Sequence, residues 1–153
     1  MSLSFTFSPL APTTGRLTGF SRGHMTVEGT VEGEEGSVTS AGRVPDQSMM
    51  LPLAVADLLA GLRSLIVGPG HGHYEFVGAD SSFRLVFTRT GDQIRITGDH
   101  RAVASVPLTE FVEVCRRDLG EFARHLLARV PGDDPVYGDL ADAHADLTEA
   151  LTT

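Results

Sequence analysis

The length, composition and charge of the chain fit one globular domain, 1–153, and exclude several classes of protein. Its 153 residues can bury a core, and no apolar run reaches the roughly 18 to 20 residues that a membrane helix needs. The 12 basic residues, all arginine, are outnumbered by 20 acidic ones, which argues against nucleic-acid binding because phosphate contacts supply most of that affinity. The start, 1–5, lacks the basic region of a signal peptide. We therefore expect a cytoplasmic protein that binds no membrane, nucleic acid or cofactor.

The first part of the chain predicts a β-hairpin that follows a loosely patterned N-terminal segment, 1–23. Within that segment, apolar residues alternate over 2–8, which is typical of a strand. Alternation returns over 24–32, where acidic and hydroxyl side chains occupy the polar face. A turn is expected at 33–36, and 37–44 is expected to be the second strand of this early hairpin.

An amphipathic helix is predicted over 51–66 because apolar residues recur there at three- and four-residue steps. The glycines and the proline of 68–70 end it. A meander of strands follows. Its clearest turn lies between Thr90 and Gln93, where Gly91 occupies the first position of a two-residue turn of type II′.

This turn fixes the register of the two strands that it joins. Pairing Thr90 with Gln93 places Arg84 opposite Asp99, which predicts a cross-strand ion pair. One face of the pair is then apolar and must face the core. The predicted core-facing side chains are Phe83, Leu85, Phe87, Ile94 and Ile96.

Two further helices complete the predicted fold. A continuous apolar stripe runs along 107–130, and a weaker one runs along 138–151, within the acidic C-terminal segment 133–153. The chain is therefore expected to adopt an α+β fold. An antiparallel sheet, made of the early hairpin and a three- to four-stranded meander, would carry two or three helices packed mainly on one face.

Two histidines and a carboxylate at alternate positions form the sharpest local pattern. His71, His73 and Glu75 would project from one face of a strand as nitrogen and oxygen ligands for zinc or a similar metal, with the Asp-His pair 99–100 to complete the set. The alternative is a connection between helix and strand with exposed polar residues, in which Glu75 faces Arg84. We take this alternative as the prediction and expect no bound metal.

No motif for catalysis is present. No serine stands in the Gly-x-Ser-x-Gly pattern of a hydrolase elbow. Cys115 is the only cysteine, so an intramolecular disulfide and a cysteine-rich zinc site are excluded. Val112 and Leu119 share its helical spacing, which predicts that this thiol is buried as a small apolar group. We expect a protein without catalytic residues rather than an enzyme.

Carboxylates are concentrated in the C-terminal segment, where no arginine occurs. Four of them follow helical steps and would form one stripe on a helix. They are Asp139, Asp142, Asp146 and Glu149. Such a stripe would attract a basic protein partner. The alternative is that these charges only keep a small domain soluble.

The order of elements over 24–130 resembles that of small bacterial α+β proteins of unknown function, some of which are immunity proteins of polymorphic toxin systems. The segments that carry the resemblance are the meander around SSFRLVFTRTGDQIRITG and the helix PLTEFVEVCRRDLGEFARHLL. It implies binding and inhibition of a cognate toxin, with acidic groups facing a basic nuclease.

The sequence therefore leaves three hypotheses about the function of this protein. The first is a non-catalytic protein-binding module of the immunity type. The second is a structural or self-associating domain that forms a homo-oligomer. The third is a metal or small-molecule binder that uses the strand of His71, His73 and Glu75.

Overall fold

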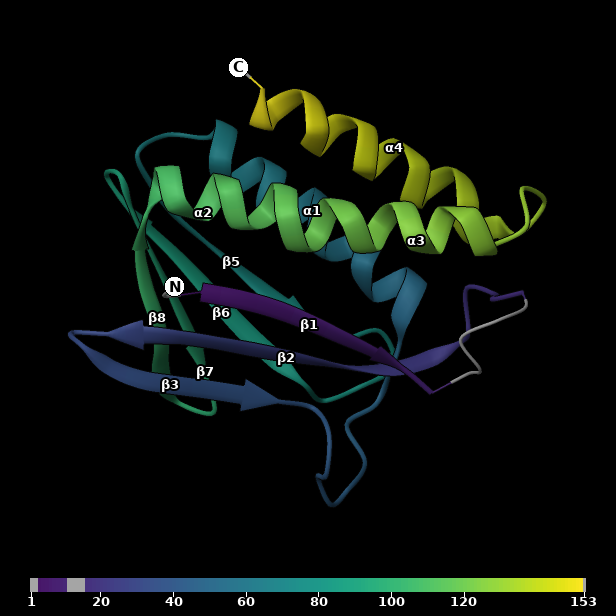
Figure 1. Ribbon diagram of the computed structural model, residues 1–153, viewed down its shortest axis with the longest axis horizontal. Helices are drawn as coiled ribbons and strands as arrows, with labels where there is room; N and C mark the ends of the chain where they lie inside the picture. Colours follow the sequence, from purple (N-terminus) through teal and green to yellow (C-terminus); the bar gives the residue numbers. More distant parts are fainter. Residues whose placement is uncertain (1–2, 11–15, 153) are drawn as a thin grey trace.

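The structure, a computed structural model, describes residues 3–10 and 16–152, and its strands form two antiparallel sheets (Figure 1). The strands of the first sheet are β1 (Leu3–Pro9), β2 (Arg22–Val31), β3 (Glu34–Thr39) and β4 (Met49–Met50). The strands of the second are β5 (His71–Val77), β6 (Arg84–Thr90), β7 (Gln93–Gly98) and β8 (Arg101–Pro107). In the first sheet, β2 pairs with the other three strands, and the second sheet follows chain order.

The helices lie together on one side of the two sheets (Figure 1). They are α1 (Leu51–Val67), α2 (Leu108–Val114), the π-helical segment η1 (Cys115–Gly120), α3 (Glu121–Arg129) and α4 (Pro135–Leu151). Together α2, η1 and α3 form one continuous rod against β1, β7 and β8, whereas α1 packs against β5 and α4. The α+β class predicted from the sequence is confirmed.

The structure differs from the expected sheet in one respect, since the early hairpin and the meander belong to separate sheets. Strands β2 and β3 contact β8 without being hydrogen-bonded to it. The contact is close at Gly36, where an added Cβ would lie 2.6 Å from the carbonyl oxygen of Val103. The missing side chain therefore lets the backbones of two sheets touch.

The register of the β6–β7 hairpin is the predicted one. Thr90 pairs with Gln93, and Gly91 has a φ of +62°, as the first position of a type II′ turn requires. The side chains predicted to face the core are buried. They are Phe83, Leu85, Phe87, Ile94 and Ile96.

The ion pair predicted between Arg84 and Asp99 is wrong. The ladder between β6 and β7 ends at Thr97, before Asp99 is reached. Asp99 lies in the next turn, with a φ of +51°, and its carboxylate pairs with Arg43. The guanidinium of Arg84 pairs instead with Glu75 across β5 and β6, at 3.1 Å.

The first turn and the last helix begin earlier than predicted. The early turn is at Glu32 and Gly33, with φ values of +54° and +84°, so β3 begins at Glu34. Helix α4 begins at Pro135 because the side chain of Asp134 accepts a hydrogen bond from the backbone N–H of Val136.

The N-terminal segment and the long helix agree with the sequence only in part. The strand predicted over 2–8 is present as β1, whereas residues 1–2 and 11–15 of the segment 1–23 lie outside the described residues. The helix predicted over 107–130 is continuous, but its middle turn is the π-helical segment η1. The thiol of Cys115 in η1 is buried, as predicted.

Candidate functional site

A groove lies between α1 and α4 on the outer surface of the helical layer. It has a volume of about 420 Å³. Helix α1 lines it with Leu53, Ala56, Asp57 and Ala60, and α4 lines it with Asp139, Asp142, Ala143 and Asp146. Apolar side chains and carboxylates therefore line the same groove, and each helix supplies four of the lining residues.

Helix α4 is held to the domain in a way that presents its carboxylates to solvent. Its apolar stripe is buried against the rest of the helical layer and comprises Val136, Leu140, Leu147 and Leu151. Asp139, Asp142 and Asp146 lie at the three- and four-residue steps beside this stripe, and their side chains are exposed. The packing of α4 against α1 then places Asp57 next to them.

The groove is strongly negative because its carboxylates are not neutralised. Across 3–10 and 16–152, no arginine forms an ion pair with Asp57, Asp139, Asp142 or Asp146. The polar partner that Asp57 has is the neutral hydroxyl of Tyr74, which donates to its Oδ2 at 3.3 Å and to its backbone oxygen at 3.1 Å. Burial, and then the charge of Asp57, raise the pKa of Tyr74, so this hydroxyl keeps its proton and remains a donor.

The sequence predicted three of these four groups and missed the fourth. Asp139, Asp142 and Asp146 meet around the groove, whereas Glu149 is exposed on α4 but is not among the lining residues. Asp57 was not predicted. The available signal was that Asp57 is the only carboxylate in the apolar stretch that forms α1.

The residues considered as metal ligands are not gathered into one cluster in the described part of the chain. His71, His73 and Glu75 occupy alternate positions on β5 with exposed side chains, and Glu75 is engaged by Arg84. In the part of the chain that the structure describes, no three His, Cys, Asp or Glu side chains come close enough to hold a metal ion. The pair 99–100 therefore does not complete the set.

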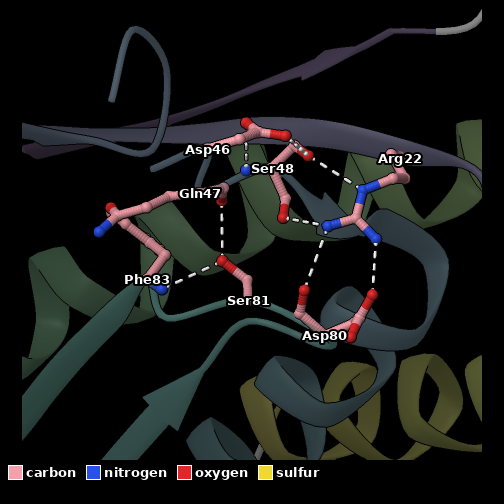
Figure 2. A network of polar contacts seen from close by, with 7 residues as sticks. All are labelled: Arg22, Asp46, Gln47, Ser48, Asp80, Ser81 and Phe83. Carbon is pink, nitrogen blue, oxygen red and sulfur yellow. Dashed lines mark hydrogen bonds and ion pairs between the residues drawn. The ribbon is translucent and has the colours of Figure 1, made fainter. Parts of the chain in front are cut away.

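A polar network joins β2 to the loops before β4 and after β5 (Figure 2). The Arg22 guanidinium donates to the Ser48 hydroxyl at 2.9 Å and to the Asp80 carboxylate at 3.0 Å. The hydroxyl and the backbone N–H of Ser48 both donate to Asp46, at 2.8 and 3.0 Å. These bonds lower the pKa of Asp46.

The hydroxyl groups of this network are engaged in hydrogen bonds that join the two loops. Ser48 is buried, and its hydroxyl is held between the guanidinium of Arg22 and the carboxylate of Asp46. Ser81 makes the matching link, since its hydroxyl donates to the backbone oxygen of Gln47 and accepts from the N–H of Phe83 (Figure 2). The network therefore fixes the two loops against each other.

The one thiol of the chain is unsuited to nucleophilic chemistry. Cys115 lies fully inside the core, and this burial raises its pKa well above the ordinary value. Nucleophilic attack needs a thiolate, which this environment disfavours.

Comparison with known proteins identifies no relative. No family model matches the chain, and neither the curated proteins nor the solved structures contain a match. Across the described ranges, no helix is both long enough and apolar enough to cross a membrane.

Proposed function

We propose that this protein is a non-catalytic binding module that docks a basic protein partner in the groove between α1 and α4. The observation that carries the proposal is the meeting of Asp57 with Asp139, Asp142 and Asp146 from a second helix around one groove. Two helices with a fixed packing hold these four charges in place, so their fields add at the groove rather than being spread over mobile side chains.

The lining of the groove also supports a protein partner. Leu53, Ala56, Ala60 and Ala143 give it small apolar surfaces among the carboxylates. The partner segment that fits has arginine or lysine side chains on both sides of a small apolar residue. Apolar contact at the centre and charges at the rim are typical of protein–protein interfaces.

A basic toxin is the class of partner that we propose. The order of elements resembles that of immunity proteins of toxin systems, and a basic nuclease would bring the charge that this groove lacks. Binding by an immunity protein requires no catalytic group in this chain. It requires a rigid negative surface, and α1 and α4 supply one.

The test is binding to a partner isolated from the native host, with two variants of equal charge. In the groove variant, Asp57, Asp139, Asp142 and Asp146 are replaced by asparagine. In the matched control, four glutamates on and around the β2–β3 hairpin are replaced by glutamine: Glu28, Glu32, Glu34 and Glu35. Affinity for the purified partner is measured by calorimetry at about 50 mM and about 300 mM salt.

The expected result is a loss of at least about tenfold in affinity for the groove variant and a smaller loss for the control. Higher salt should weaken the wild type and have less effect on the groove variant, because screening acts on the charges that the variant lacks. Equal affinity losses in the two variants, or unchanged affinity in the groove variant, would contradict docking at this groove.

A further inference from the structure

Strand β5 is the terminal strand of the second sheet, and one of its edges is unpaired. Two hydrogen bonds show which residues face that edge. The N–H of Gly91 donates to the oxygen of Gly70 at 2.5 Å, and the N–H of Gly78 donates to the oxygen of Phe83 at 2.9 Å. In an antiparallel ladder these inward-facing positions alternate with outward-facing ones. The residues whose backbone groups point away from the sheet are therefore His71, His73, Glu75 and Val77.

The outer edge of β1 provides a contrast, because side chains occupy it. The carboxylate of Asp118 accepts the N–H of Phe5 at 2.8 Å, and Arg117 donates to the oxygen of Leu3 at 3.2 Å. On β5, by comparison, no outward backbone group is hydrogen-bonded to another part of the described chain. An edge strand left in this state is a template for pairing with another strand.

The β5 edge is also accessible. The side chains of its four outward-facing residues are exposed on the face of the sheet that no helix covers. An open cavity of about 270 Å³ lies beside the first part of this strand, where His71 and His73 line it together with Ser64 of α1. At Gly61 the missing side chain lets the ring of Tyr74 pack against α1, since an added Cβ would lie 2.1 Å from that ring.

We propose that β5 pairs in antiparallel orientation with β5 of a second copy of this chain, with the twofold axis at Tyr74. This register matches every outward-facing residue with another outward-facing one, and it forms about eight backbone hydrogen bonds. It places His73 opposite Glu75 of the second copy and His71 opposite Val77 of the second copy. The two sheets then continue as one sheet across the dimer.

The side chains select this register over its neighbours. A shift of two residues in one direction would place Glu75 opposite Glu75 of the second copy, which is repulsive. A shift in the other direction would place His73 opposite His73 and lose backbone pairs at the ends. The sequence His-Gly-His-Tyr-Glu-Phe-Val is therefore complementary to itself at one alignment. This self-pairing uses the backbone edge of β5, whereas the groove lies between α1 and α4; Asp57 is the groove residue that reaches β5, through the hydroxyl of Tyr74.

The experiment is sedimentation equilibrium of the full chain from about 10 μM to about 1 mM, the range in which a small interface dissociates. The wild type should populate a dimer. His73→Pro removes an outward-facing N–H without removing a hydrogen bond to β6, so dimerisation should weaken at least about tenfold while the far-ultraviolet circular dichroism is unchanged. A variant with Asp139, Asp142 and Asp146 replaced by asparagine should dimerise like the wild type, because these residues line the groove and lie on α4 rather than on β5.

A second pair of variants tests the register without relying on proline. His73→Glu places two carboxylates opposite each other and should weaken the dimer, whereas His73→Glu combined with Glu75→His restores opposite groups and should recover it. A monomer at every concentration would overturn the proposal. So would a dimer that is equally strong in His73→Pro, in His73→Glu and in the wild type.

Discussion

The replacement of Phe87 by alanine tests how the core of this protein is assembled. Phe87 is fully buried on β6, and three aromatic rings surround it. The ring centroids of Phe5, Tyr74 and Phe111 lie 6.4, 6.0 and 6.2 Å from its own. These rings belong to β1, β5 and α2, so the side chain joins both sheets to the helical rod.

The expected destabilisation follows from this position. Removal of a buried phenylalanine ring costs about 3 to 5 kcal/mol, from lost burial and from the cavity that remains. The upper half of this range is expected for Phe87→Ala, because its neighbours are anchored in three different elements and cannot all move into the space. For a chain of this length, a loss of about 4 kcal/mol lowers Tm by roughly 8 to 16 °C.

Urea unfolding followed by circular dichroism measures this free energy directly, provided that the slope of the transition is unchanged. Phe20→Ala is the matched control, since the Phe20 side chain is 70% exposed and its removal should change the free energy of unfolding by no more than about 0.5 kcal/mol. A loss below about 1.5 kcal/mol for Phe87→Ala would refute the argument that this ring joins the two sheets.

Two further predictions concern polar groups in the helices. Asp118→Ala leaves the N–H of Phe5 without its acceptor and should cost about 1 to 3 kcal/mol in urea unfolding, whereas Asp118→Asn keeps an acceptor and should cost less. Burial, and then the charge of Arg124, lower the pKa of His144 from its ordinary value of 6.5, so the folded state favours the neutral ring. The unfolded chain then binds the proton more readily, and stability should fall as pH decreases below 6.5. His144→Gln should remove this part of the slope in unfolding midpoints measured against pH, and an unchanged slope would contradict the assignment.

The parts of the fold that the sequence predicted are those specified by neighbouring residues. Alternation and the turn at Gly91 set the register of the β6–β7 hairpin, because only glycine adopts the required φ at no steric cost. Helical periodicity located α1 and α4, because the apolar residues that define it stand only three and four positions apart. Each of these signals is contained within about 20 residues of sequence.

The candidate groove could be predicted only in part, because it depends on contacts between distant segments. Periodicity shows that Asp139, Asp142 and Asp146 share a face of α4, but it does not show which helix lies beside them. Asp57 joins them because α1 packs against α4, and its position in α1 alone carries no such information.

Local departures from regular structure were the other source of error. Asp99 and His100 both have positive φ values, of +51° and +64°. Aspartate and histidine are enriched at such values among residues other than glycine, but the preference is too weak to locate the tight turn from the sequence. The segment Cys115–Gly120 has the apolar spacing of an ordinary helix, and nothing in it predicts a π-helical turn.

The contact between η1 and β1 has a consequence for folding during synthesis. Asp118 is 113 residues further along the chain than Phe5, and its carboxylate accepts a hydrogen bond from the N–H of Phe5. At translation rates of about 5 to 20 residues per second, Phe5 of β1 is synthesised roughly 6 to 23 s before Asp118, whose carboxylate covers the outer edge of that strand. The outer edge of β1 therefore stays without this cover, and open to other nascent chains, at least until residue 118 has been added to the chain.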